Sequence, residues 1–416
     1  MEVNYKMTEP VTAQLSTTNS GPLAGVKVLD LTTVVMGPYA TQILGDMGAD
    51  VIKIEAPAGD NMRWVGPMRH AGMGHIFMNA NRNKRSLVLD LKHPDGLAAI
   101  KRLIAQSDVL IYNVRPHAMQ RLGLSYEAVF GINPAIIYVG AIGFSERGPY
   151  AGRPAYDDLI QGMAAVASLS LQQGSDVPRY APTTLGDRSV GLQTAIAVTG
   201  ALYHRAKTGV GQQVTVSMFE SLSQFVLGDH LGGKSFVPSE GEPGYARLLA
   251  QHRRPYATED GYLCVLIYND KHWQRFFALI DQPELGQDPR FCTHSARAAN
   301  IDAVYTYVAQ VMQTKTNAQW MALFDEGDIP AAPMHTLDSL IDDPHLNAIN
   351  YFPQFEHPSE GRMRMTAPVG DYSATPLTIR RLAARLGEHS REVLREAGYC
   401  DADIDVMIAS KATVGV

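Results

Sequence analysis

One acidic residue of this sequence lies where a carboxylate could act as a nucleophile. In the segment Ala181–Gly191 (APTTLGDRSVG), small residues lead to Gly186 and Asp187, and a long, mostly apolar stretch with helical spacing follows. A carboxylate at the start of a helix lies near the positive end of the helix dipole and near free backbone amides. We expect Asp187 to stay ionised at neutral pH and to be able to attack an electrophilic carbon. The local sequence leaves a second interpretation open, in which Asp187 only caps the helix.

Other well-known catalytic motifs are missing from the sequence. The first predicted strand–helix turn, Thr32–Tyr39 (TTVVMGPY), lacks the GxGxxG pattern of dinucleotide sites, and the chain has no GxxxxGK[ST] and no GxSxG. The 13 histidines are scattered without an HExxH pair, so we expect no metal site. The chemistry must therefore come from carboxylates, backbone amides and basic residues.

Strand-like and helix-like segments alternate through the first half of the chain. This alternation predicts an α/β fold, with a mostly parallel sheet and helices on both faces. The predicted strands are Val26–Leu31, Val51–Glu55, Ser86–Leu91, Asp108–Asn113, Ala135–Gly140 and Gln213–Met218, and the predicted helices are Ala40–Gly48, Pro94–Gln106, Asp187–Lys207 and Glu220–Leu227.

Changes in composition divide the chain further. Gly and Pro cluster from Gly228 to Gly244, which indicates a loop between domains. We expect a flexible tail at 1–20, a large domain at 21–227, a smaller α+β domain at 228–335, and a C-terminal part at 336–416 that returns to the large domain. The last part contains a predicted helix at Ser390–Ala397.

The composition is typical of a folded protein. The 416 residues include 36 Lys and Arg and 42 Asp and Glu, which gives a formal charge of −6 and argues against a nucleic-acid partner. No apolar run approaches the ~18 residues that a membrane span needs, and no secretory signal is visible. The three cysteines are far apart and suggest no disulfide framework. We therefore expect a cytoplasmic protein.

Several segments, taken in order, resemble the class III CoA-transferase family (CaiB/BaiF type), which includes formyl-CoA:oxalate and carnitine CoA-transferases. They run through almost the whole chain, and the ordered set is much more specific than any single segment. The matching segments are Val26–Arg63, Asn81–Gly96 (NRNKRSLVLDLKHPDG), Asn113–Leu124 (NVRPHAMQRLGL), Leu185–Asp187 (LGD), Thr208–Met218 (TGVGQQVTVSM) and Leu386–His389 (LGEH).

This resemblance implies a fold, a partner and a reaction. The large domain would be Rossmann-like and bind CoA, and two subunits would interlock as a homodimer. Asp187 would be the nucleophile that moves CoA from an acyl-CoA to a carboxylic acid, through an aspartyl anhydride and an aspartyl-CoA thioester. The CoA thioester is a substrate, and no permanently bound cofactor or metal is implied.

The resemblance also implies the residues of the site. Tyr156 and Gln161 could line the acyl site. Because the phosphates of CoA need cations, Lys84 and Arg85 are further candidates for binding them. The implied CoA contacts are Val35, Met36, Leu89, Asp90, Leu91, Lys92, Asn113, Val114, Arg115, Arg121 and Tyr156.

Departures from the family pattern bear on the substrate. Val35 stands where the formyl-CoA branch has Gln, Ala56 replaces an Arg, and Leu231–Lys234 (LGGK) replaces a run of glycines. Formate and oxalate are therefore disfavoured. Arg188 lies beside the nucleophile, and Arg153 and His117 could be near it. An extra cation of this kind could bind the second carboxylate of a diacid, which gives a weak preference for succinyl-CoA.

Two alternative functions stay open. An α-methylacyl-CoA racemase shares this fold and uses a His and an Asp as an acid/base pair. Arg153 stands where its His would fall, and Arg188 follows Asp187 where the racemase has glycine, so the transferase is favoured. The second alternative is a non-catalytic CoA-binding protein.

Overall fold

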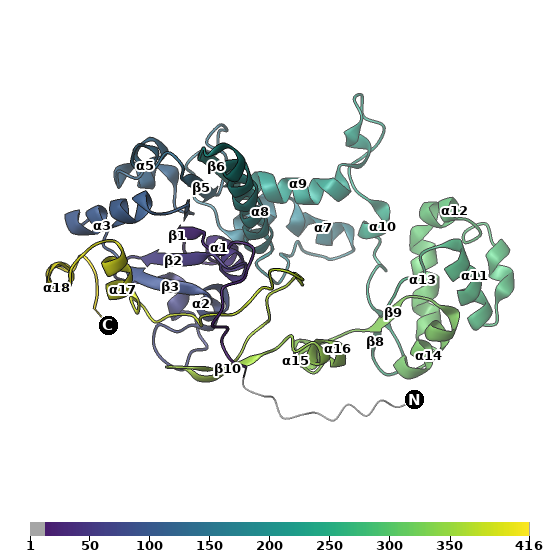
Figure 1. The fold of residues 1–416 in the computed structure, drawn as a ribbon. Helices are drawn as coiled ribbons and strands as arrows, with labels where there is room; N and C mark the ends of the chain where they lie inside the picture. The colour runs from purple at the N-terminus through teal and green to yellow at the C-terminus, as the bar shows by residue number, and fades with distance from the viewer. Residues whose placement is uncertain (1–12, 416) are drawn as a thin grey trace. The chain divides into compact units, whose positions relative to one another are not determined.

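The computed structural model of the chain describes residues 13–415, which form two compact units (Figure 1). Unit 1 comprises 13–164, 182–223 and 345–415, and unit 2 comprises 165–181 and 224–344. The predicted boundaries at 228 and 335 differ from this division. In particular, 165–181, which we expected in the large domain, belongs to unit 2.

The first twenty residues were expected to form a flexible tail. For residues 1–12 this prediction lies outside the described part of the chain. Within 13–20, the backbone N–H of Ser16 donates to the Ile379 carbonyl at 3.0 Å, and the Asn19 side-chain amide donates to the Gly48 carbonyl at 2.8 Å. This stretch is therefore anchored to unit 1, in contrast to the predicted loose tail.

A six-stranded parallel sheet forms the centre of unit 1. Its strand order is β3-β2-β1-β4-β5-β6, with β1 paired in register to β2 on one side and to β4 on the other. The order reverses between β1 and β4, which is where doubly wound sheets bind their ligands. This sheet confirms the predicted α/β class. The strands are β1 (Lys27–Leu31), β2 (Asp50–Glu55), β3 (Lys84–Val88), β4 (Val109–Tyr112), β5 (Ile137–Ile142) and β6 (Gln212–Ser217).

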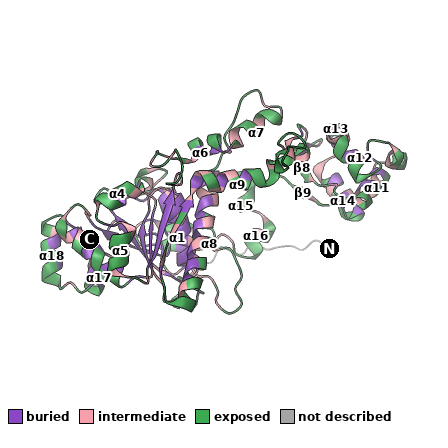
Figure 2. Ribbon diagram, turned by 90° about the horizontal axis from the view of Figure 1, so that it is seen from above, coloured by how far each residue is buried: buried purple, intermediate pink, exposed green. Residues whose placement is uncertain are grey.

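Helices cover both faces of this sheet, because neighbouring strand residues point to opposite faces. Val28 packs with Val198 of the long helix α8 on one face, whereas Leu29 packs with Ile100 of α3 on the other. Most residues of the sheet strands are coloured as buried in Figure 2. The helices of unit 1 are α1 (Met36–Asp46), α2 (His75–Ala80), α3 (Pro94–Ala105), α4 (Pro116–Arg121), α5 (Tyr126–Ile132), α6 (Asp157–Met163), α8 (Leu185–Thr208), α17 (Ser390–Glu396) and α18 (Asp401–Ala409), with a 3₁₀ turn η1 (Asn61–Trp64).

Two helices lie where the chain passes from one unit to the other, and a strand pair and a C-terminal helix complete unit 1. Helix α9 (Met218–His230) begins in unit 1 and continues into unit 2. Helix α16 (Pro344–Ala348) begins at the last residue of unit 2, and its remaining residues belong to unit 1. Strands β10 (Gln354–His357) and β11 (Gly361–Arg364) form an antiparallel pair. Helix α18, which the sequence patterns did not predict, buries Ile404 and Met407 in the core that also contains α3 and α17.

Unit 2 combines a small antiparallel sheet with helices, as expected for an α+β domain. Its core is aromatic and includes Trp273, Phe276 and Trp320. The strands, in the order β7-β8-β9, are β7 (Tyr256–Ala257), β8 (Tyr262–Val265) and β9 (Ala331–Pro333). The helices are α7 (Val166–Gln172), α10 (Ala246–Leu249), α11 (Asp270–Leu279), α12 (His294–Ala299), α13 (Ile301–Met312), α14 (Asn317–Gly327) and α15 (Leu337–Ile341), with 3₁₀ turns η2 (Gly232–Ser235) and η3 (Pro283–Gln287).

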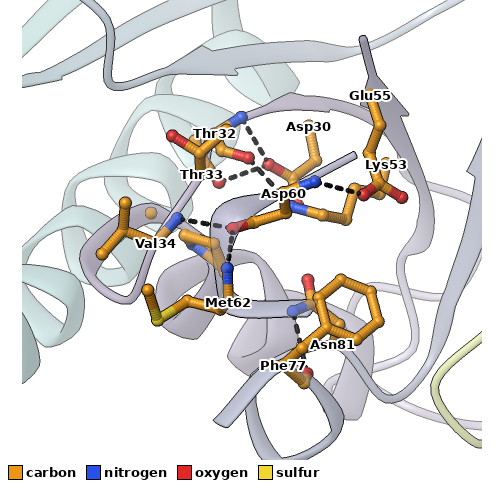
Figure 3. Close-up of polar contacts among 12 residues, drawn as sticks. Asp30, Thr32, Thr33, Val34, Lys53, Glu55, Asp60, Met62, Phe77 and Asn81 are labelled. Carbon is orange, nitrogen blue, oxygen red and sulfur yellow. Dashed lines mark hydrogen bonds and ion pairs between the residues drawn. The ribbon is translucent and has the colours of Figure 1, made fainter. Parts of the chain in front are cut away.

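A buried ion pair holds the turn between β1 and α1. The Lys53 ammonium on β2 donates to the Thr32 carbonyl at 2.9 Å and to the Asp60 carboxylate at 3.0 Å (Figure 3). The other Asp60 oxygen accepts the backbone N–H groups of Val34 at 3.2 Å and Met62 at 3.0 Å. One carboxylate thus joins the β1–α1 turn to β2 and to η1.

A second buried carboxylate lies directly beneath this turn. Asp30 on β1 accepts from the Thr32 and Thr41 hydroxyls at 2.5 and 2.7 Å and from the Lys84 ammonium at 3.0 Å. Burial alone would raise the pKa of Asp30, but Lys84, Lys53 and the two hydroxyls outweigh it and lower the pKa to about 2. Burial likewise disfavours the charge on Lys53, yet the surrounding carboxylates raise its pKa above the ordinary value. These groups therefore stay charged inside the protein.

We predict that Lys53→Met will strongly destabilise unit 1. The substitution leaves Asp60 buried without its cation, and breaking a buried pair in this way costs roughly 3–5 kcal/mol. In denaturant unfolding followed by circular dichroism, the variant should unfold at a lower denaturant concentration than the wild type. Lys101→Met on the exposed side of α3 is the matched control, and it should change stability by less than ~0.5 kcal/mol. Equal stability of the two variants would contradict the role given to the buried pair.

Candidate active site

Unit 1 contains a cavity of about 410 Å³ at the carboxyl ends of its central strands. Its walls come from the turns after β1, β4, β5 and β6, which meet where the strand order reverses. The lining residues are Thr33, Val34, Met36, Asn61, Asn113, Val114, Arg115, Pro116, Ala118, Arg121, Ile142, Gly143, Phe144, Glu146, Gly152, Arg153, Pro154, Ala155, Tyr156, Asp187 and Met218.

Asp187 enters this cavity from the first turn of α8. It is the third residue of the helix, and Thr184 occupies the N-cap position, so the interpretation of Asp187 as the N-cap residue is wrong. Helix α8 lies very close to α1, because a Cβ at Gly191 would stand 2.8 Å from the Met36 carbonyl oxygen. Glycine at this crossing lets the start of α8 approach the turn after β1.

A second carboxylate holds the start of α8. Asp157, the first residue of α6, accepts the backbone N–H of Asp187 at 2.9 Å. Its other oxygen accepts from the Gln161 side chain at 2.6 Å, and Gln161 also donates to the Thr183 carbonyl at 3.3 Å. Gln161 is fully buried and does not line the cavity. The structure therefore places Gln161 behind Asp157 rather than against an acyl group, which was its expected position.

The environment of Asp187 opposes its negative charge. Burial raises the pKa of Asp187 to about 7, the nearby Asp157 carboxylate contributes to this increase, and Arg188 acts against it. The expectation that the helix start keeps Asp187 fully ionised at neutral pH is therefore wrong, because desolvation and the Asp157 charge outweigh the stabilisation of the carboxylate by the helix start and by Arg188. Within residues 13–415, no hydrogen bond is made by the Asp187 carboxylate oxygens. The group is therefore not committed to a structural contact.

Six of the expected CoA contacts line the cavity together: Met36, Asn113, Val114, Arg115, Arg121 and Tyr156. The Asn113 side chain also clamps the turn after β1, because it accepts from the Thr33 N–H at 2.9 Å and donates to the Thr33 carbonyl at 2.7 Å. Arg115 and Arg121 have no carboxylate partner among the residues described. The cavity thus offers two guanidinium groups to an anion.

The other expected contacts lie elsewhere. Val35 and Leu89 are buried in the core, and Asp90, Leu91 and Lys92 follow β3 without lining the cavity. Asp90 instead accepts the Lys92 N–H at 3.0 Å, which shapes a local turn. Arg188 also lies outside the lining, with its guanidinium carbon 4.5 Å from the centroid of the Tyr39 ring.

Lys84 and Arg85 already have carboxylate partners. Lys84 is buried against Asp30, and Arg85 pairs with Asp50 at 2.6 Å, with Glu396 at 2.7 Å and with Glu392 at 2.8 Å. Their charges are neutralised inside unit 1. The proposal that either one binds a CoA phosphate is therefore corrected by the structure.

Sequence reasoning missed Val34 and Glu146, whereas it named Arg153 as a cation that could lie near the nucleophile. Val34 has φ of +71°, a strained value for a β-branched residue, and its N–H is held by Asp60. Their positions in the sequence were the available signal, because Val34 and Glu146 lie within four residues of the carboxyl ends of β1 and β5. Arg153 lies 4.8 Å from the Tyr150 ring centroid and adds a third cation to the cavity.

Among the helices of residues 13–415, none has the length and apolar character needed to cross a bilayer.

Comparisons with known proteins agree with this geometry. The model of CoA-transferase family III matches residues 23–390. The chain is 33% identical over 404 residues to the succinyl-CoA–L-malate CoA-transferase beta subunit of Chloroflexus aurantiacus, covering 94% of this chain and 97% of the relative. It is 29% identical over 396 residues to the human succinyl-CoA:glutarate CoA-transferase, covering 94% and 90%.

A solved structure supports the same assignment. The crystal structure of a CaiB/BaiF family protein from Brucella suis matches with a TM-score of 0.77 and 30% identity, covering 91% of this chain and 100% of that chain. Together the matches favour a transferase over a racemase and over a non-catalytic CoA-binding protein. The chain belongs to CoA-transferase family III and is a CoA-transferase.

Proposed function

We propose that the enzyme moves CoA from succinyl-CoA to a carboxylic acid, with Asp187 as the nucleophile. The observation that carries this proposal is the position of Asp187. Its carboxylate lies on the wall of the unit 1 cavity, half-buried and without a hydrogen-bond partner in the described chain, and three arginines line the same cavity. A carboxylate, room for a thioester and cations for its phosphates are the parts that this transfer needs.

The proposed reaction exchanges activated acyl bonds. An oxygen of the Asp187 carboxylate attacks the thioester carbonyl, the carbon–sulfur bond breaks, and CoA leaves as the thiolate. The thiolate then attacks the aspartyl carbonyl of the anhydride, which releases the donor acid as a carboxylate and leaves an aspartyl-CoA thioester. The acceptor carboxylate attacks this thioester, and the same steps run in reverse. No proton is consumed over the cycle.

Burial of Asp187 supports this role. A carboxylate that has lost part of its hydration is a stronger nucleophile toward a carbonyl than one in bulk water. Asp157 and Gln161 act as positioning residues, since together they hold the backbone at the start of α8. The turn after β1 lines the same cavity as Asp187, and it is held by Asn113, Lys53 and Asp60.

Arg115 and Arg121 suit the phosphates of CoA. Arg115 precedes α4 and Arg121 ends it, and both side chains are exposed at the cavity. Guanidinium groups bind phosphate oxygens in a bidentate manner, so two of them can hold separate phosphates. Met36 and Val114 supply apolar surface for the chain that joins the phosphates to the sulfur.

The choice of succinyl-CoA as the donor rests on the second negative charge of a dicarboxylate and on the cations that line the cavity. Two relatives are named for succinyl-CoA, and their other substrates, L-malate and glutarate, are also dicarboxylates. A second carboxylate needs a cation beyond those that hold the phosphates. Arg153 lines the cavity and is the better placed residue, because Arg188 is stacked on Tyr39 outside the lining. The interlocked homodimer and the cytoplasmic location implied earlier stay predictions.

We predict that Asp187→Ala will lose nearly all transfer while remaining folded. Removal of a covalent nucleophile lowers kcat by at least ~10⁴-fold. In the wild type, borohydride added during turnover should reduce the aspartyl-CoA thioester, and mass spectrometry should find the change on the peptide that contains Asp187. Asp158→Ala on the same helix as Asp157 is the control and should keep near-normal turnover. Wild-type activity in Asp187→Ala would exclude the mechanism.

The raised pKa of Asp187 predicts an acid limb in the pH profile. Only the carboxylate attacks, so kcat/KM should fall about tenfold per pH unit below a pKa near 7. Asp157→Asn removes the neighbouring negative charge and should shift this limb to lower pH. A limb that does not move in Asp157→Asn would show that the Asp157 charge does not act on Asp187.

The same shift affects stability. The pKa of Asp187 is raised from its usual 3.8, so the folded state holds this proton more tightly than the unfolded chain does. The free energy of unfolding should therefore fall as pH rises between about 4 and 7, because ionised Asp187 destabilises the folded state. Asp187→Asn should reduce this pH dependence in thermal unfolding.

Arg153→Gln should discriminate diacids from monoacids. Loss of a charge-assisted hydrogen bond is worth about 1.5–3 kcal/mol, so KM for succinate or glutarate should rise roughly tenfold to a hundredfold. KM for acetate or propionate should hardly change. Arg188→Gln is the matched comparison, and we expect it to show no such selectivity. Selective loss in Arg188→Gln instead would transfer the role to that residue.

A further inference from the structure

Unit 2 contains a second cavity, of about 320 Å³. It lies against β7, β8 and the following loop, and it includes residues of α11 and α13. This volume is near the lower end of the ~300–1,000 Å³ that small-molecule sites occupy.

The charge around this cavity is entirely positive. Arg247, Arg253 and Arg254 line it, and no acidic residue does. In the described chain, none of these three side chains makes an ion pair or a hydrogen bond with another residue. Three guanidinium groups thus share one cavity without a protein counter-charge, which is unfavourable until an anion enters.

The remainder of unit 2 is organised differently. Its Asp and Glu residues outnumber its Lys and Arg residues. Arg275 pairs with Asp328 at 2.9 Å, Arg290 pairs with Asp288 at 2.7 Å, and Arg297 pairs with Asp270. Carboxylates are therefore plentiful in this unit, yet they are kept away from the cavity. This contrast indicates that the cavity is arranged for an anion from solution.

The rest of the wall is apolar and aromatic. Trp273 and Val308 belong to the buried core, and Tyr256 and Tyr305 add ring surface with hydroxyl groups. Burial raises the pKa of Tyr256, Tyr305 adds to this, and Arg247 opposes it, so the hydroxyl stays protonated and can donate a hydrogen bond. A simple inorganic ion would leave this wall without a partner.

We propose that the unit 2 cavity binds a small organic anion that carries at least two negative charges on an apolar or aromatic body. Arg247, Arg253 and Arg254 bind the charged groups, and Trp273, Tyr305 and Val308 pack against the body. Nucleoside diphosphates and dicarboxylates both have this chemistry. The site is independent of the catalytic proposal for Asp187, and its test does not use transfer activity.

Cys264 lies in the cavity and reports on its occupancy. The chain has three cysteines, all exposed and free, so the Cys292→Ser/Cys400→Ser variant leaves Cys264 as the only thiol. The rate of its reaction with a neutral maleimide would be measured with ADP, glutarate, inorganic phosphate or adenosine present. A ligand at ten times its Kd should slow the reaction about tenfold by simple occupancy.

We expect saturable protection by ADP or by glutarate, and little by phosphate or adenosine. Protection by ADP alone identifies a nucleoside phosphate, and protection by glutarate alone identifies a dicarboxylate. In the same background, Arg253→Gln/Arg254→Gln should abolish protection, whereas Arg290→Gln and Arg115→Gln should retain it. Circular dichroism would confirm that each variant is folded. Absence of protection by both anions, equal protection by adenosine, or protection that survives Arg253→Gln/Arg254→Gln would overturn the proposal.

Discussion

The buried pair of Lys53 and Asp60 is the interaction on which the site in unit 1 depends. Lys53 reaches from β2 to the carbonyl of Thr32, and Asp60 holds the amide of Val34, so the turn after β1 is fixed from both sides. Two charges buried away from water are stable only when they lie close together and make further hydrogen bonds, and few conformations of the turn allow this. The strained φ of Val34 persists because these contacts leave the turn little freedom.

This rigid turn and the start of α8 line the same cavity. The contact at Gly191 brings α8 against α1, and Asp157 holds the amide of Asp187. The cost of the arrangement is a carboxylate whose pKa is raised to about 7. Such a cost is expected at a position that serves reactivity, because the same desolvation that weakens folding also activates the nucleophile.

The two cavities illustrate how charge separates structural from binding roles. Lys84 and Arg85 are buried and fully paired, and their positive charges serve the core. Arg115 and Arg121 in unit 1, and Arg253 and Arg254 in unit 2, face cavities without a carboxylate partner among residues 13–415. A cation in the sequence indicates a ligand only once its neighbours are known.

Local patterns in the sequence determined the parallel sheet and the longest helices of unit 1, because alternation and helical spacing are readable within a few residues. The local sequence left Asp187 open as a capping residue, and the resemblance selected it as the nucleophile. The resemblance pointed to Met36, Asn113, Arg115, Arg121 and Tyr156, which the fold does bring together. Only the tertiary structure decided that Gln161 lies behind Asp157, that Lys84 and Arg85 are neutralised, and that Asp187 is desolvated. Those outcomes depend on contacts between segments far apart in the chain, such as Arg85 with Glu396, and no local pattern encodes the burial and pairing that such contacts create.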